Sequence, residues 1–325
     1  MSSTATLSTL SPPAAVELAL VARGPTTTNV GLLRAFRRLG IEAELVHPDA
    51  LVGGREPDVA FARLDVRPTL DGVEQGFFAL RRSEQGGLPI LNPPGALAAC
   101  HDKLVTALRL GEARLPHPRT AHVDGDGPPP SLEPPYVVKP RFGSWGCDVT
   151  LSRDARELAR RLRGLARRPW FALHGALVQE FLPSGGRDLR LVVAGGAVVG
   201  AVERRARRGE WRTNVALGAT RHPVAPPTDA SALAVAAAEA VGADLVGVDL
   251  IPTPSGWVVL ELNGAVDFTD DYSFGDANVF DLAAERLAAT IGLGGLSSAG
   301  APLRAAPARR NGSRPRTEPS CTVCT

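Results

Sequence analysis

Alternating apolar and polar positions divide the first third of the chain into short elements. The predicted strands are Val16 to Val21, Ala43 to Val46 and Val59 to Leu64. After the first of them, Thr28 or Asn29 can cap a helix whose apolar positions recur at helical spacing as far as Gly40. Strands and helices that alternate in this way are typical of an α/β layer. We therefore expect a small amino-terminal α/β domain over residues 1–95.

Proline, glycine and the apolar pattern define a second group of elements. Pro89 to Pro94 should interrupt the chain, and Asp124 to Pro135 has the composition of a surface loop. The predicted helices are His101 to Leu110 and the arginine-rich Asp154 to Arg168. Strands are predicted at Tyr136 to Lys139 and Asp148 to Leu151, and a further apolar segment runs from Ala176 to Leu182. A glycine-bearing run, Arg141 to Gly146, separates the two strands. We assign residues 96–182 to a central domain that carries this loop.

Two β-hairpins are the clearest signals in the last third of the chain. The first joins Leu189–Ala194 to Ala197–Arg205 through Gly195-Gly196, a favoured two-residue turn, and the second joins Val246–Ile251 to Trp257–Asn263. Helices are predicted from Ser231 to Val241 and from Val279 to Ile291. We assign residues 183–293 to a carboxyl-terminal domain and expect the Gly-, Ala-, Ser-, Pro- and Arg-rich segment 294–325 to be disordered.

The charge pattern excludes several classes of protein. Lys plus Arg is 36 and Asp plus Glu is 34, and a net charge of +2 gives little reason to expect a nucleic-acid or acidic-membrane binder. Ser231 to Ile251, the most apolar long stretch, contains three acidic residues and is therefore no ordinary membrane span. Since no basic residue precedes Arg23, a secretory signal is not expected. We predict a soluble cytoplasmic protein and leave a homo-oligomer open.

Lysine occurs only at Lys103 and Lys139, so the other 34 of the 36 basic residues are arginine. A lysine retained in such a chain suggests a compact ammonium group directed at a phosphate, although chance retention explains it equally well. No P-loop, G-x-G-x-x-G, G-x-S-x-G or H-E-x-x-H motif is present, so a serine hydrolase or zinc peptidase is not expected. Gly143 and Gly146, beside Lys139, fit either a lid over phosphates or a plain turn.

The second hairpin carries candidate metal donors. Glu261 and Asn263 should point to one face of their strand, with Val258, Leu260 and Leu262 on the other face. Asp249 on the partner strand should lie opposite Val259 or one diagonal step from Glu261. Clustered carboxylates repel each other and attract a cation, and an all-oxygen set suits magnesium better than zinc. The alternative is a solvated hairpin edge with unrelated acids.

The first hairpin carries a second cluster of charged residues. If Ala194 pairs with Ala197, Asp188 lies opposite Glu203, with Arg190 and Arg205 as diagonal neighbours on the same face. A surface salt-bridge network is the simpler interpretation. The arginines that follow, including Arg204 and Arg212, are usually solvated, but beside a metal site they could hold a polyphosphate through bidentate contacts.

In chain order, these residues resemble the ATP-grasp superfamily and, within it, the RimK-like carboxylate-amine ligases. The resemblance covers residues 95 to 292 well and the amino-terminal domain in outline. The segments that carry it are His101-Asp102-Lys103, Val138-Lys139-Pro140 with the glycine loop, Val178 to Phe181, Gly185 to Arg190, Glu203 to Ala206, Arg212-Thr213-Asn214, Gly247-Val248-Asp249 and Glu261-Leu262-Asn263.

The resemblance implies an ATP-grasp fold, in which two α+β subdomains clamp ATP behind the small α/β domain. It implies that Lys103 and Lys139 bind ATP phosphates beneath the Gly143–Gly146 loop, and that Gln179, Glu180, Phe181 and Leu182 form the hinge that holds adenine, with Asp188 near the ribose. Further implied contacts are Arg212 and Asn214 with the triphosphate or the intermediate, Arg190 and Arg204 with substrate or phosphate, and Asp249, Glu261 and Asn263 with Mg²⁺, for which Mn²⁺ is an alternative.

The reaction implied is ATP-dependent amide formation. The γ-phosphoryl group moves onto a carboxylate, and an amine then attacks the acyl phosphate, which adds an amino acid such as glutamate to a small molecule, peptide or carrier protein. Two other functions compete: a nucleotide-binding scaffold without turnover, and an acyl-phosphate-forming kinase without an amine step. The intact set of both lysines with Asp249, Glu261 and Asn263 argues against the scaffold.

Two parts of the sequence depart from the family or fall outside its motifs. Glutamate ligases of this type place a Ser-Pro-Gly turn after the metal-binding Asn, whereas this chain has Gly264 to Phe268, which resembles the branch that acts on the acidic end of a small carrier protein. The number of residues added is not readable. Cys321 and Cys324 form a C-x-x-C pair in the tail, for which an inert end is favoured over a metal or redox site.

Overall fold

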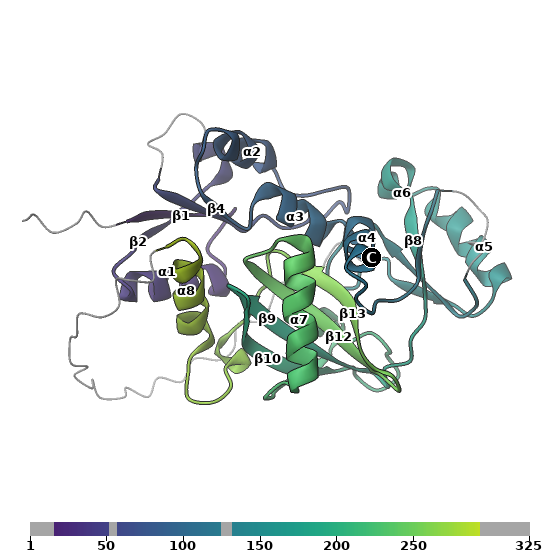
Figure 1. Cartoon of the computed structure of the whole chain (residues 1–325). Helices are drawn as coiled ribbons and strands as arrows, with labels where there is room; N and C mark the ends of the chain where they lie inside the picture. Colours follow the sequence, from purple (N-terminus) through teal and green to yellow (C-terminus); the bar gives the residue numbers. More distant parts are fainter. Residues whose placement is uncertain (1–15, 52–56, 125–131, 293–325) are drawn as a thin grey trace, which may run out of the picture.

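A computed structural model describes residues 16–51, 57–124 and 132–292, which form three β-sheets flanked by helices (Figure 1). The tail predicted to be disordered, with Cys321 and Cys324, lies outside these residues. Within the described ranges, no helix has the length and apolar character that crossing a membrane requires. The division of the chain into domains stays a prediction.

The first sheet is parallel, with strand order β2-β1-β3-β4. It consists of β1 (Glu17–Val21), β2 (Glu42–Val46), β3 (Val59–Ala62) and β4 (Ile90–Leu91), connected by α1 (Thr27–Arg38), a 3₁₀ turn η1 (Pro48–Leu51) and α2 (Phe77–Gln85). The hydroxyl of Thr26 caps α1 by accepting from Asn29 N, so the predicted cap at Thr28 or Asn29 is two or three residues too late. Helix α2 was not predicted, because its first residue follows Gly76 without a side-chain cap.

The second sheet is antiparallel, with order β5-β8-β6-β7. Its strands are β5 (Thr120–Val123), β6 (Tyr136–Pro140), β7 (Thr150–Ser152) and β8 (Ala176–Glu180), and its core includes side chains of α5 (Ala155–Leu165) and α6 (Pro169–His174). The helix predicted to reach Arg168 ends at Leu165. The reason is Pro169, which forces the preceding Arg168 into extended backbone and begins a new helix.

Two helices precede this sheet where one was predicted. Helix α3 (Pro94–His101) begins at Pro94, the residue expected to end a breaker, and α4 (Lys103–Glu112) follows after one residue. The chain turns at Asp102, whose carboxylate caps α4 by accepting from Leu104 N at 3.1 Å. This cap places Lys103 at the first helical position. Both helices contribute to the core of the third sheet through Ala99, Cys100 and Leu110.

The third sheet is antiparallel, with order β11-β10-β9-β12-β13. Its strands are β9 (Arg187–Ala194), β10 (Ala197–Arg205), β11 (Thr220–Pro223), β12 (Leu245–Thr253) and β13 (Gly256–Asn263). The remaining elements of this part of the chain are α7 (Thr228–Val241), α8 (Val279–Thr290) and the 3₁₀ turns η2 (Val215–Leu217) and η3 (Asp270–Tyr272). Along β9, Leu191 and Val193 pack in the cluster that contains α7, while Val192 and Ala194 pack with α8 and α1. The central strand is therefore covered on both faces.

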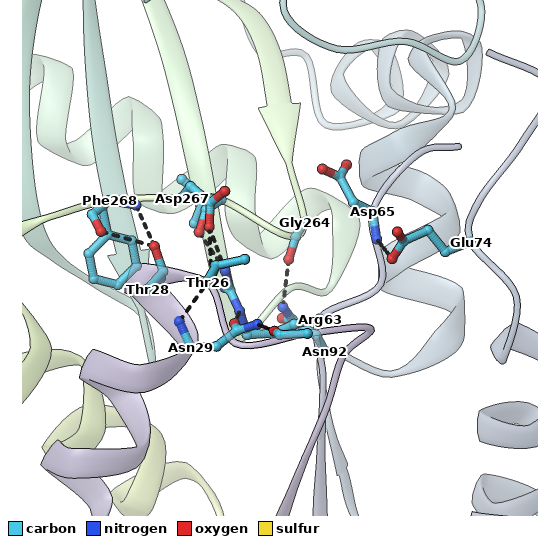
Figure 2. A network of polar contacts seen from close by, with 12 residues as sticks. Thr26, Thr28, Asn29, Arg63, Asp65, Glu74, Asn92, Gly264, Asp267 and Phe268 are labelled. Carbon is cyan, nitrogen blue, oxygen red and sulfur yellow. Dashed lines mark hydrogen bonds and ion pairs between the residues drawn. The ribbon is translucent and has the colours of Figure 1, made fainter. Parts of the chain in front are cut away.

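A loop after β13 rests on the carboxyl edge of the first sheet (Figure 2). The hydroxyl of Thr28 donates to Phe268 O at 2.9 Å and accepts from Phe268 N at 2.8 Å. Buried Arg63, directly after β3, donates to Asn29 Oδ1 at 2.6 Å and to Val266 O at 2.8 Å. The amino-terminal sheet thus fixes the backbone of the loop in which the sequence departs from the glutamate ligases.

The fully buried Asn92 joins the same two parts of the molecule (Figure 2). Its amide group donates to Leu245 O at 2.7 Å and to Gly264 O at 3.1 Å, and its carbonyl oxygen accepts from Asp244 N at 2.8 Å and Leu245 N at 2.9 Å. Every polar atom of this side chain is therefore hydrogen-bonded. The contacts connect the end of β4 to the start of β12 and to the residue that follows Asn263.

Candidate functional site

A cleft between the second and third sheets gathers nearly all the predicted site residues. Those that line it are Lys103, Lys139, Gly143, Gly146, Gln179, Glu180, Phe181, Leu182, Asp188, Arg204, Arg212, Asn214, Asp249 and Glu261. The predicted residues outside this lining are Arg190, which is hydrogen-bonded to Asp249, and Asn263, two positions after Glu261 on β13. The cleft thus has a hinge segment at the end of β8 and a charged cluster on β9, β10, β12 and β13.

A bulge in the β9–β10 hairpin changes which charged residues meet. The register shifts between Val198 and Gly200, so Asp188 lies opposite Arg204 and not opposite Glu203 as predicted. The extra residue turns Arg204 inward. Arg205, predicted to share the face of Asp188, instead pairs with Glu203 and is exposed. The prediction failed because one inserted residue reverses the faces of every residue beyond it.

Arg204 is 4% exposed and lies between two buried carboxylates. Its Nε donates to Asp188 Oδ1 at 2.8 Å, and its Nη2 lies 2.9 Å from Asp249 Oδ2. Arg190 makes a bidentate pair with Asp249, with both N–O distances 2.7 Å. Burial opposes ionisation of Asp249, but Arg190 and Arg204 together hold its pKa at about 2. Two arginines and two aspartates thus form one buried, charge-paired network.

A second bulge brings the predicted metal donors together. The register of β12 and β13 shifts after Asp249, so Asp249 lies directly opposite Glu261, closer than the predicted diagonal step. Leu260 consequently lines the cleft beside Glu261, whereas it was expected on the far, apolar face. Val259 takes the core position instead.

The two lysines approach this cluster from the other side of the cleft. Lys103 Nζ lies 3.0 Å from Glu261 Oε1 and donates to Gly143 O. Lys139, on β6, is buried, and burial lowers its pKa to about 8, although the charge of Glu261 opposes this shift. Buried ammonium groups beside a carboxylate and a glycine loop form a strongly polar end of the cleft.

The hinge segment is tied into the second sheet. Glu180 N donates to Arg119 O at 3.0 Å and Phe181 N donates to Pro135 O at 3.1 Å, while the Glu180 carboxylate accepts from Arg119 Nε at 2.9 Å. Gln179 is likewise held, through its amide to Thr120 Oγ1 at 2.7 Å. These contacts fix the segment against β5 and against Pro135, the residue before β6.

The loop between β6 and β7 covers the polar end, and residues 143–149 are called the glycine lid below. A Cβ on Gly146 would lie 2.6 Å from Asn214 Oδ1 and would displace that side chain, and the φ of +77° also favours glycine. Arg212 Nη1 donates to Gly146 O at 3.2 Å and to Val149 O at 3.0 Å. The lid is therefore in contact with the segment that follows β10.

The donor chemistry of Asp249, Glu261 and Asn263 fits a hard divalent cation. The strand register places Asp249 opposite Glu261 and Gly247 opposite Asn263, so carboxylate and amide oxygens come from adjacent positions. The buried Asn263 Nδ2 has no hydrogen-bond partner in the described residues, so no such bond fixes the amide orientation. Within the part of the chain that the structure describes, no three or more His, Cys, Asp or Glu side chains lie together in a way that could hold a metal ion. The amide oxygen is therefore needed to complete the set.

Sequence reasoning missed two residues of this site. Arg141 makes a bidentate pair with Asp102, at 2.7 and 2.6 Å, and so joins the start of the lid loop to the cap of α4. Glu210 binds the guanidinium of Arg212. An acid two residues before a predicted site arginine was a visible signal, but nothing in the sequence fixed the turn that brings the two side chains together.

Comparison with known proteins agrees with the family that the sequence resembles. The RimK-like ATP-grasp domain family matches residues 128–282. A relative from Xanthomonas axonopodis pv. citri, named "Probable alpha-L-glutamate ligase", is 31% identical over 252 residues, which are 74% of this chain and 81% of the relative. A second, from Stenotrophomonas maltophilia with the same name, is 31% identical over 256 residues, or 74% of this chain and 82% of the relative.

Solved structures share the fold. The RimK domain ATP-grasp protein from Sphaerobacter thermophilus superimposes with a TM-score of 0.61 at 22% identity, covering 84% of this chain and 99% of that one. D-alanine–D-alanine ligase from Bacillus anthracis complexed with ATP gives 0.55 at 15% identity, covering 87% and 94%. The predicted ATP-grasp fold is thereby confirmed. The chain belongs to the RimK-like ATP-grasp family and is an ATP-dependent ligase.

Proposed function

We propose that this ligase joins a carboxylate to an amine through an acyl phosphate, and that it adds an amino acid such as glutamate to a small molecule, peptide or carrier protein. The observation that carries the proposal is the position of Glu261, which lies directly opposite Asp249 and pairs with Lys103 at the same end of one cleft. That end combines carboxylates with ammonium groups, as transfer of a phosphoryl group between two anions requires.

The nucleotide would lie along the cleft. The hinge, Gln179 to Leu182, would hold adenine, with Asp188 toward the ribose, while Lys103 and Lys139 would bind the phosphates. Lys139 carries its positive charge below pH values of about 8, so it is charged at neutral pH. Arg204 and Asn214 remain candidates for contact with the phosphates or the intermediate, whereas Arg212 has one N–H group, on Nη2, left for such a contact.

Asp249, Glu261 and Asn263 would hold magnesium, or manganese in its place. The metal would supply Lewis-acid neutralisation of the transferring phosphoryl group. At present Arg190 and Arg204 neutralise Asp249, and Lys103 neutralises Glu261. Because the two arginines hold the pKa of Asp249 below its usual value, this carboxylate is ionised and can serve as an oxygen donor.

The chain's own residues would protect the reaction from water. A carboxylate is a poor electrophile, so phosphorylation by ATP supplies the leaving group that an attacking amine displaces. The acyl phosphate would hydrolyse if water reached it, and the glycine lid closes the polar end of the cleft from the side of the second sheet. Fixed positions of the lysines and the lid supply the rest of the rate enhancement.

The acceptor would approach from the first sheet. The loop 264–268 follows the predicted metal donor Asn263 and is anchored to Thr28 and Arg63. Its Asp267 is exposed, while Gly264, Val266 and Phe268 are buried, so Asp267 is the residue of this loop that an acceptor could reach. Relatives named as glutamate ligases support an amino-acid substrate. The run Gly264 to Phe268, which resembles the branch that acts on the acidic end of a small carrier protein, favours such an acceptor.

A product analysis tests the proposal. The protein is incubated with ATP, magnesium, a pool of amino acids, and small acidic peptides or carriers, and ADP release and product masses are measured. We expect ADP release that depends on an amine and a product heavier by one or more amino-acid residues. ADP release that needs no amine would instead indicate an acyl-phosphate-forming kinase, and no release at all would indicate a scaffold. Either result contradicts the proposal.

A further inference from the structure

The guanidinium of Arg212 has almost no hydrogen-bonding capacity left for a phosphate. A guanidinium carries five N–H groups. Nε donates to Glu210 Oε1 at 3.1 Å, Nη2 donates to Glu210 Oε2 at 2.9 Å, and Nη1 donates to two carbonyl oxygens of the glycine lid. A single N–H on Nη2 is not accounted for. In this arrangement the principal partners of Arg212 are an acid of its own segment and the lid backbone.

Glu210 determines where that guanidinium points. Its Oε1 also accepts from Trp211 N at 2.9 Å and Arg212 N at 3.0 Å, so the carboxylate is fixed by the backbone of the residues that follow it. The hydrogen bonds from Arg212 lower the pKa of Glu210 to about 2, and the carboxylate is therefore charged throughout the range of any assay. Because Nε and Nη2 are held by Glu210, the Nη1 group is the part of the guanidinium that points at the lid.

The segment 210–212 also contacts the hinge. The Trp211 ring meets Phe181 edge to face, with ring centroids 5.7 Å apart, and the Arg212 guanidinium lies 5.9 Å from the Trp211 centroid. One short segment therefore touches the hinge at one end of the cleft and the lid at the other.

We propose that Glu210 is a positioning residue that orients Arg212 so that Arg212 holds the glycine lid closed through Gly146 O and Val149 O. Arg212 thus acts on the lid backbone more than on phosphate. The inference about lid closure stands on the geometry alone. Its consequence for the reaction, protection of the acyl phosphate from water, rests on the proposed function.

Hydrogen exchange of the full chain tests the geometry, without nucleotide and independently of any activity. The variants are Glu210→Gln, Glu210→Asp and Arg212→Lys, with Glu203→Gln as the control, because Glu203 is an acid on β10 that pairs with Arg205 and Arg187 away from the lid. We expect peptides that cover residues 143–149 to exchange about tenfold faster in both Glu210→Gln and Arg212→Lys. Glu210→Gln removes the negative charge and one of the two acceptors of the bidentate pair, and Arg212→Lys removes the planar guanidinium that makes it. Glu210→Asp, which keeps the charge on a shorter side chain, should give a smaller increase, and Glu203→Gln none.

Three results would overturn the proposal. These are lid exchange in Glu210→Gln within twofold of the parent protein, an equal increase in Glu203→Gln, or an increase spread evenly over α7 and the third sheet, which indicates a general loss of stability. If Glu210→Gln does not fold, Arg212→Lys decides by the same criteria.

The ratio of ADP released to amide formed provides the second readout. It should rise severalfold in Glu210→Gln and stay unchanged in Glu203→Gln, because an open lid admits water to the acyl phosphate. An unchanged ratio in a variant whose lid exchanges faster would reject the protective role and leave the positioning role supported. If no protein in the set releases ADP, the proposed function fails while the exchange result still decides the inference.

Discussion

Replacing Arg204 by Ala should destabilise the protein far more than replacing its neighbour Arg205. Arg204 is 4% exposed and pairs with Asp188 and Asp249, which are themselves buried. Loss of one partner from a buried ion pair leaves uncompensated charge and costs about 3–5 kcal/mol. Arg205 is exposed and pairs with Glu203, so Arg205→Ala should cost no more than about 1 kcal/mol.

The difference should depend on pH in a defined direction. Arg190 and Arg204 hold the pKa of Asp249 below its usual value of 3.8 in the folded protein, so its ionisation contributes stability that is present above pH 4 and lost as the pH falls toward about 2. In Arg204→Ala the pKa of both carboxyl groups rises, because Asp188 keeps only the Thr213 hydroxyl as a partner among the described residues. Protonation then relieves the repulsion, so the variant loses less stability on acidification than the parent.

Urea unfolding followed by tryptophan fluorescence at pH 7 and pH 4 measures both effects. We expect a loss of about 3–5 kcal/mol for Arg204→Ala at pH 7 and a smaller loss at pH 4. A loss at pH 7 no larger than that of Arg205→Ala would refute the assignment of a buried network. A loss that is equal at the two pH values would refute the electrostatic reason for it.

Three further substitutions test the polar end of the cleft. Lys139→Ala should weaken ATP binding about tenfold at pH 7 in a calorimetric titration. The ATP affinity of the parent protein should fall between pH 7 and 9, because Lys139 loses its proton near pH 8, and the variant should show no such fall. Glu261→Ala should lower turnover by about a hundredfold or more while the circular dichroism spectrum stays unchanged, and a variant that keeps most of its activity would contradict the metal assignment. Gly146→Ala should lower the free energy of unfolding by about 1–2 kcal/mol because of its φ of +77°, and it should raise the KM for ATP. Gly185→Ala is the control, since its φ is +64° and nothing lies within 4 Å of the added Cβ. It should lower the free energy of unfolding and leave the KM for ATP unchanged.

Local chemistry explains which parts of the fold could be predicted from the sequence. The hairpin turn at Gly195-Gly196 is readable because both residues have positive φ, which glycine adopts without strain. The bulge four residues later is not readable. A Cβ on Gly200 would lie 2.6 Å from Val279 Cγ2 and 3.1 Å from Tyr272, so the close packing at this point involves residues more than 70 positions away. That single unreadable feature put Arg204, and not Arg205 as the register predicted, on the face of Asp188.

The candidate site shows the same limit. The predicted residue types converge on one cleft because each belongs to a motif with its own local spacing. Their pairing could not be predicted, since Asp249 meets Glu261 only through the bulge at Leu260. Glu210 was overlooked because its position against Arg212 depends on a turn in which Glu210 N donates to Arg207 O at 3.0 Å.

The contacts of Asn92 restrict how the cleft can open. Its side chain joins β4 to β12, and one apolar cluster runs from Leu32 and Phe36 of α1 to Phe280 of α8 and Val192 of β9. The second sheet has a separate cluster of its own. Any substrate-driven movement should therefore be a swing of residues 120–124 and 132–180 against the first and third sheets. Both the entry of nucleotide and the departure of ADP would then depend on this movement of the second sheet.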